Sequence, residues 1–112
     1  MKSRKIYAEV NPEILYDEVK DFVQKQGLIL DEAGLQTYSV PGGSSHVVRG
    51  TLIFKREGDG GEGQCFRAHI VGSAVGETRL MIDVDDSILS AEKIAAIQED
   101  LDFIFGAYEV KP

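Results

Sequence analysis

The chain has 112 residues, a length that suits one domain, and we treat residues 1–112 as a single domain. Its 12 Lys and Arg stand against 19 Asp and Glu, a net charge of −7, which argues against general nucleic-acid binding because such binding neutralises phosphates. The one cysteine, Cys65, excludes an intrachain disulfide, and no run approaches the roughly 18 apolar residues of a membrane span. These features predict a cytoplasmic protein without membrane association.

The N-terminal residues predict a strand followed by a helix. Residues 5–10 alternate as in a half-buried strand, with Ile6, Ala8 and Val10 on one side and Lys5, Tyr7 and Glu9 on the other. Asn11 is a suitable N-cap, and Pro12 suits the first helical position because its missing N–H would have no partner there. Gly27 is expected just beyond the helix end. The apolar stripe of this helix comprises Leu15, Val19, Phe22 and Val23.

Residues 28–85 have the pattern of four or five short strands. Segments 28–30 and 35–40 are extended, with a turn or bulge at 31–34 between them, and 41–45 is a loop. Further strands are expected at 46–56, 64–71 and 77–85, joined by a hairpin tip at 57–63 and a turn at 72–76. Consecutive strands joined by short glycine-rich turns predict an antiparallel meander.

The last helix completes the expected fold. Ser90 is a suitable cap and Gly106 is expected to end the helix. Its apolar stripe comprises Ile94, Ile97, Leu101, Ile104 and Tyr108. The expected fold class is α+β: an antiparallel sheet of about five to six strands with two helices on one face, in the order β-α-β-β-β-β-α. The first strand is expected to pair with a strand that is not its neighbour in sequence.

Two segments resemble the helix-grip group of folds, which includes the repeat unit of the TATA-box-binding protein and the START-like lipid- and hormone-binding domains. Segment 11–19, NPEILYDEV, is similar to the START-like opening, in which a strand runs through a proline into the first helix. Segment 76–84, GETRLMIDV, is similar to a late strand of that group. The chain is shorter than the usual START-like domain and lacks its second short helix. The resemblance implies a fold far more than a function.

Strand alternation separates two faces of the expected sheet. The core face is assigned Val48, Leu52, Phe54, Phe66, Ala68, Ile70, Leu80, Ile82 and Val84. The opposite face is assigned Arg49, Thr51, Ile53, Lys55, Cys65, Arg67, His69, Val71, Glu77, Arg79, Met81 and Asp83. This second face has more basic than acidic side chains. Its candidate interaction residues are Arg49, Lys55, Arg67, His69 and Arg79. The alternative is a solvated face whose charges pair across strands.

The residues typical of catalysis and metal binding are not grouped in a recognisable motif. Cys65 and His69, four apart on one strand, are roughly 13 Å apart and too distant to share a zinc ion. Asp86 and Ser87 are expected to cap the following turn rather than to form a cation site with Asp83 and Asp85. The glycine-rich segment 58–63 lacks the Gly-Lys-Ser/Thr ending of a phosphate loop. We therefore predict no catalytic residue, no metal site and no cofactor.

Two hypotheses for function remain, and an enzyme is a third without supporting residues. The first is a non-catalytic binding domain of helix-grip type that holds a small apolar ligand between the sheet and the last helix. Its candidate ligand residues, each also expected in a plain core, are Phe54, Phe66, Ile82, Ile97, Leu101 and Ile104. The second is a homodimer or other protein association through the open sheet face, with a polyanion such as nucleic acid as a weaker version.

Overall fold

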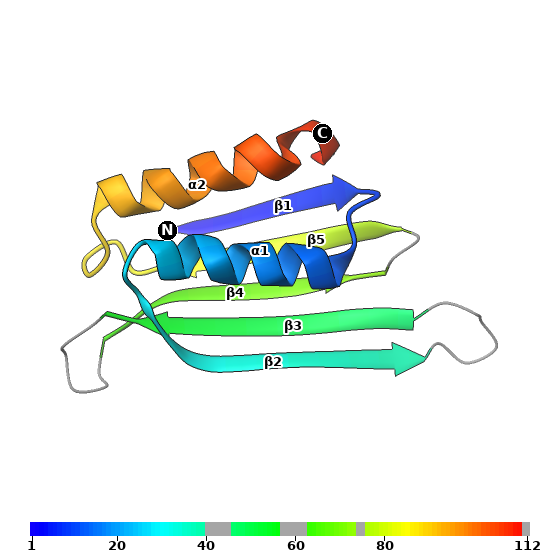
Figure 1. Cartoon of the computed structure of the whole chain (residues 1–112), viewed down its shortest axis with the longest axis horizontal. Coiled ribbons are helices and arrows are strands. Elements are labelled where there is room, and N and C mark those ends of the chain that lie inside the picture. Colours follow the sequence, from blue (N-terminus) through cyan, green and yellow to red (C-terminus); the bar gives the residue numbers. More distant parts are fainter. Residues whose placement is uncertain (40–45, 57–62, 74–75, 111–112) are drawn as a thin grey trace.

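Five antiparallel strands in one sheet and two helices build the fold (Figure 1). The computed structural model describes residues 1–39, 46–56, 63–73 and 76–110. In chain order the elements are β1 (Lys2–Ala8), α1 (Pro12–Lys25), β2 (Ile29–Ser39), β3 (His46–Lys55), β4 (Gln64–Gly72), β5 (Glu77–Val84), α2 (Ala91–Phe105) and a short 3-10 helix (Gly106–Tyr108). The order and class match the expectation from sequence. The predicted loop at 41–45 and the hairpin-tip residues 57–62 lie outside the described residues.

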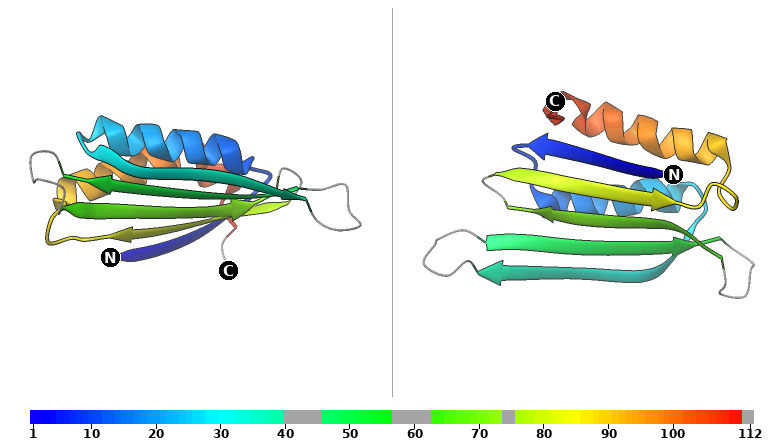
Figure 2. Two further views of the ribbon diagram at one scale, coloured as in Figure 1. Left: turned by 90° about the horizontal axis from the view of Figure 1, so that it is seen from below. Right: turned by 180° about the vertical axis from the view of Figure 1, so that it is seen from behind.

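Both helices lie on the same face of the sheet, and no described element covers the opposite face (Figure 2). α1 packs over β3 and β4. α2 lies beside β1, where Ile97 and Leu101 approach Phe66 and Ile82 of the sheet. The strand order β1-β5-β4-β3-β2 places the first strand against the last, as antiparallel neighbours.

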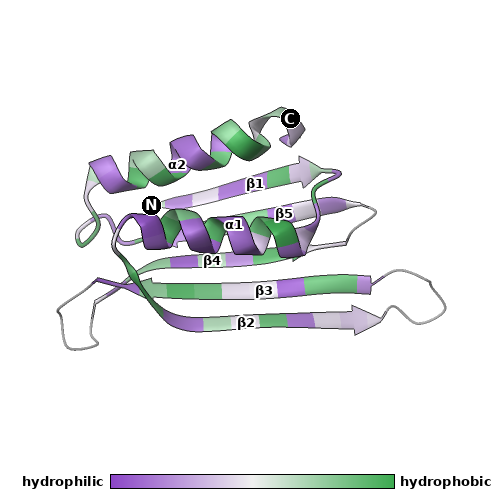
Figure 3. Cartoon of the chain, in the orientation of Figure 1, coloured by the Kyte–Doolittle hydropathy of each residue, from purple (hydrophilic) through white to green (hydrophobic). Residues whose placement is uncertain are grey.

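The signals at the ends of α1 act as the sequence predicts. The side chain of Asn11 accepts a hydrogen bond from the backbone N–H of Glu13 at 2.8 Å, and Pro12 occupies the first turn. Gly27 follows the helix with φ +85°, a left-handed conformation that glycine adopts without steric cost. The polar and apolar stripes of α1 are visible in Figure 3. The predicted stripe is buried against the sheet: Leu15, Val19, Phe22 and Val23.

The phase of β1 is a correction to the sequence analysis. Tyr7 is 0% exposed and belongs to the core, whereas Ile6 and Ala8 are half-buried on the other side of the strand. Alternation alone fits either phase, because it shows that two sides differ and not which side meets the helices. Here the Tyr7 ring packs on Phe105 of α2, with centroids 5.9 Å apart, and this contact selects the phase.

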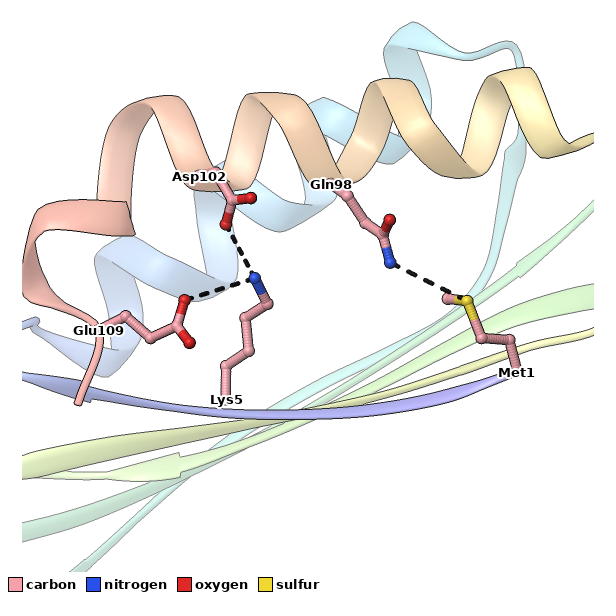
Figure 4. A network of polar contacts seen from close by, with 5 residues as sticks. All are labelled: Met1, Lys5, Gln98, Asp102 and Glu109. Carbon is pink, nitrogen blue, oxygen red and sulfur yellow. Dashed lines mark hydrogen bonds and ion pairs between the residues drawn. The ribbon is translucent and has the colours of Figure 1, made fainter. Parts of the chain in front are cut away.

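Lys5 lies on the same side of β1 as Tyr7 and ties the C-terminal region to the sheet (Figure 4). Its Nζ lies 2.8 Å from a carboxylate oxygen of Asp102 and 3.5 Å from one of Glu109. Burial alone would lower the pKa of Lys5, but the hydrogen bond and negative charge of Asp102, with Glu109, outweigh it and raise this pKa. The backbone N–H of Val110 donates to the carbonyl of Ile6 at 2.7 Å, so the C-terminal segment occupies part of the outer edge of β1.

β2 is one continuous strand rather than two extended pieces. The predicted irregularity is a bulge between Leu30 and Glu32, after which pairing with β3 continues through Ala33 and Gly34. A bulge adds one residue to a strand without ending it, so the extended pieces on either side join. Beyond the bulge, residues 32–39 are all exposed.

A second bulge moves Cys65 from the predicted outer face into the core. The register shifts where Lys55 pairs with Gln64 while Phe54 pairs with Phe66, so one extra residue stands in β4. Cys65 and Phe66 are therefore both buried, at 2% and 1% exposure, although they are adjacent in sequence. Strict alternation fails at such a point because the added residue resets the phase.

The C-terminal half of α2 is rotated relative to the prediction. Ser90 caps the helix, accepting from the N–H of Lys93, and Gly106 follows the last helical residue as expected. Ile97 and Leu101 are buried, but Phe105 takes the next position on this face, and Ile104 is 43% exposed. Tyr108 is also exposed. Residues 104 and 105 both follow Leu101 at a helical spacing, so the pattern alone allows either to be buried. The contact of the Tyr7 ring with Phe105 selects Phe105.

Candidate interaction surface

The five strands present a continuous surface on the side away from the helices, which we call the outer face (Figure 2). Cross-strand register places its residues in rows; one row runs Gln36, Arg49, Val71, Arg79 and Ile6 from β2 to β1. The next row runs Gly34, Thr51, His69, Met81 and Arg4, and a third runs Glu32, Ile53, Arg67, Asp83 and Lys2. Cationic side chains are thus interspersed with apolar and polar ones over the three rows, with acids at Glu32 and Asp83.

The outer face carries the opposite net charge to the chain. Of the chain's 12 Lys and Arg, six of the described ones lie on this face: Lys2, Arg4, Arg49, Lys55, Arg67 and Arg79. Of the 19 acids, those we place there in the described residues are Asp31, Glu32, Glu77 and Asp83. A chain of net charge −7 therefore has one positive face, and its acids are concentrated elsewhere.

Most of these cations have no carboxylate partner in the described part of the chain. Lys55 forms an ion pair of 3.9 Å with Asp31, and Arg67 donates a hydrogen bond of 3.0 Å to Gln64. Arg67 and the other four cations of the face make no ion pair with any described residue. The expected alternative, a face whose charges neutralise one another across strands, holds for Lys55 alone.

The β1 side of the outer face contains a depression of about 210 Å³. Three cations and one acid line it, Met81 contributes an apolar side chain, and His69 shares a polar contact of 3.4 Å with the hydroxyl of Thr51. The lining residues are Lys2, Ser3, Arg4, Arg67, His69, Met81, Ile82 and Asp83. Lys2 and Arg4 were absent from the predicted set, because only the pairing of β1 with β5 brings them beside Arg67 and His69. Their signal in the sequence is a Lys-x-Arg alternation at the start of the first strand.

The predicted ligand residues lie together in the core, with one exception. Phe54, Phe66, Ile82, Ile97 and Leu101 are all buried, and the rings of Phe54 and Phe66 meet edge to face at 5.9 Å. Ile104 points to the surface instead. The space between α2 and the sheet is about 10 Å³, room for about one water. Pockets for small molecules occupy about 300–1,000 Å³, far more than this space offers.

Cys65 should be protected from alkylation in the folded protein. Burial raises the pKa of its thiol, and the thiolate is the reactive form. We expect iodoacetamide at pH 8 to modify native Cys65 at least about tenfold more slowly than the guanidinium-unfolded chain, measured by intact mass. Equal rates in the two states would mean that Cys65 is exposed on the outer face and that β4 has no bulge at this position.

The acidic cluster at the end of β5 forms a capped turn. Asp85 accepts hydrogen bonds from the backbone N–H of Ser87 at 3.0 Å and from its hydroxyl at 2.6 Å, and these bonds lower the pKa of Asp85. The capping acid is thus Asp85 rather than Asp86 as predicted. Among the described residues, no group of three or more His, Cys, Asp or Glu is placed to hold a metal ion.

Two further observations concern the chain as a whole. No helix among residues 1–39, 46–56, 63–73 and 76–110 is both long and apolar enough to cross a membrane. Comparison with known proteins found no family model, no curated protein and no solved structure that matches this chain.

Proposed function

We propose that this protein is a small non-catalytic binding module whose outer face holds an acidic segment of a partner protein. The observation that carries the proposal is a positive sheet face that no described element covers, on a chain of net charge −7, with five cations that form no ion pair with a described carboxylate. A carboxylate-rich partner would supply the missing counter-charges. A cytoplasmic location and membership of the helix-grip group are parts of this proposal.

The composition of the outer face favours protein over nucleic acid. Apolar Ile53, Val71 and Met81 are interspersed among the cations, and methionine and arginine are enriched where proteins meet. Tyr38, on the same side of β2 as Gln36, is the one aromatic side chain that we place on the outer face among the described residues, whereas single-stranded nucleic acid is held by stacking successive bases on several aromatics. The acidic remainder of the chain would also repel a long phosphate backbone.

Reversing two central cations should abolish partner binding without unfolding the protein. Arg67 and Arg79 are both exposed, so Arg67→Glu with Arg79→Glu should leave the melting temperature within a few degrees of wild type. We expect wild-type protein on a support to retain a reproducible partner from extract of the source cells. The double variant should lose it by at least about tenfold, because like charges now meet across the interface. The readout is quantitative mass spectrometry, and acidic segments should be enriched at cross-links to the outer face.

A matched double reversal on the helices controls for net charge. Lys20→Glu and Lys93→Glu change the charge by the same amount but lie on α1 and α2, away from the outer face. This variant should retain the partner. If the Arg67/Arg79 variant keeps the same partner at wild-type yield, or both variants lose it equally, the outer face is not the binding surface. A partner that proves to be RNA or DNA would equally contradict the proposal.

A further inference from the structure

The two edges of the sheet differ in how they are protected. The edge at β1 is partly occupied, since Tyr7 bridges to Glu109 and Val110 donates to Ile6. The edge at β2 is free of any such contact with the described residues, although β2 is eleven residues long. Proteins usually blunt a free edge with proline, charged side chains, a bulge or a short strand; β2 has a bulge and two acids near its start, at Asp31 and Glu32, but residues 33–39 carry none of these. A row of backbone donors and acceptors that no described residue pairs therefore runs along residues 33–39 of β2.

Gly34 stands at the centre of this edge, and the packing of its own chain does not require a glycine. Its φ is not positive, and a Cβ built on it would meet no atom within 4 Å. An interior glycine weakens a strand and often marks a point where another backbone approaches closely. Gly34 is the midpoint of Ile29–Ser39, so an antiparallel copy centred there would pair the two strands symmetrically.

The charges beside this edge complement those of a second, antiparallel copy. Pairing centred on Gly34 sets Glu32 of one copy opposite Gln36 of the other, and Gln36 is itself paired with Arg49. Glu32 of one copy would then lie two strands, or roughly 10 Å, from Arg49 of the other on the outer face, a span that the two long side chains cover together. Neither residue has an ion-pair partner among the described residues. The acids of β2, Asp31 and Glu32, lie near one end of the strand, so antiparallel pairing also keeps them apart.

We infer that the protein forms a homodimer in which β2 pairs antiparallel with β2 of a second copy about a two-fold axis at Gly34. On the helix side, Leu35, which is 43% exposed in one copy, would pack against Ala33 of the other. α1 lies over β3 and β4, which leaves room above β2 for this contact. The two-fold axis keeps both helix layers on one side and joins the two outer faces into one cationic surface. The inference does not rest on the proposed function, since a monomer would present the same outer face.

A charge on the two-fold axis should separate the copies. In Gly34→Lys, two lysines would stand directly opposite each other, while the space around residue 34 leaves the single copy unstrained. We expect sedimentation velocity to show concentration-dependent dimers of wild-type protein and a dissociation constant at least about tenfold higher for Gly34→Lys. Gly34→Thr is the matched control: it adds an uncharged side chain of high strand propensity and should keep the dimer. Amide exchange of residues 32–36 should slow with concentration in wild type and not in Gly34→Lys.

A charge swap tests the register. Within one copy Glu32 pairs with Ile53 and not with Arg49, which is four residues, or roughly 13 Å, further along β3. Glu32→Arg and Arg49→Glu should each weaken the dimer several-fold, and the double swap should restore most of the lost affinity. Such restoration is expected only if the two residues meet between copies.

Three results would overturn the inference. Wild-type protein that stays monomeric up to about millimolar concentration has no dimer of useful affinity. A dimer unaffected by Gly34→Lys uses another surface. A dimer that the double swap fails to restore has a different register. None of these results bears on binding of an acidic partner, which the Arg67/Arg79 variant measures separately.

Discussion

Leu101→Ala is expected to lower the free energy of unfolding by about 2–5 kcal/mol, among the larger losses for a single substitution in this chain. Leu101 is 1% exposed, and its side chain points from α2 to the sheet, near Phe66 and Ile82. The space beside it is only about 10 Å³, so the truncation removes packed atoms rather than enlarging an existing pocket. Urea unfolding followed by circular dichroism measures the loss.

Ile104→Ala is the matched control on the same helix. The two residues occupied one predicted stripe, but Ile104 is 43% exposed, and its truncation should cost well under 1 kcal/mol. The difference between the variants therefore tests the rotation of α2. Equal costs for the two variants would mean that both residues are buried, as the sequence pattern predicted. A cost under 1 kcal/mol for Leu101→Ala would mean that α2 is not packed as described.

Gly72→Ala is the second large effect, with an expected loss of about 1–3 kcal/mol from overpacking. A Cβ at residue 72 would lie 2.8 Å from the Cα of Thr78 in the neighbouring strand, and backbone cannot move aside as a flexible side chain can. Thr78 is itself fixed: it is 0% exposed and donates a hydrogen bond of 2.6 Å to the carbonyl of Val10. The substitution must therefore displace β5 or break a buried hydrogen bond.

Gly34→Ala provides the comparison, because its added Cβ meets no atom within 4 Å. It should raise stability by about 0.5–1 kcal/mol, since alanine loses less backbone freedom than glycine on folding. Both variants are measured by thermal unfolding at the same low protein concentration. If Gly72→Ala is as stable as wild type, β4 and β5 do not approach as closely at this point as the structure places them.

The predicted interaction residues show where the two-residue period assigns side chains to the correct face of this sheet and where it does not. Arg49, Lys55, Arg67, His69 and Arg79 were assigned to one face from the two-residue period, and the cross-strand register confirms that they share it. Cys65 was assigned to the same face and is buried, because the bulge beside it adds a residue that has no signature in a single sequence. Alternation therefore holds along each uninterrupted run and fails across a bulge.

The sequence by itself determined the features that depend on residues close together in the chain. The cap at Asn11, the stop at Gly27, the stripe of α1 and the order of elements all arise from local steric preference and hydrogen bonding. The excess of acid is a property of composition, and its consequence for nucleic-acid binding follows without a structure.

Only the tertiary structure decided which strand lies beside which. The contact of Tyr7 with Phe105 selected the phase of β1, and pairing of β1 with β5 brought Lys2 and Arg4 to the depression on the outer face. Packing of Phe105 on Tyr7 set the rotation of α2 and left Ile104 exposed. Each choice is a contact between residues far apart in sequence, and a periodic pattern that fits two phases equally well contains no information about such a contact.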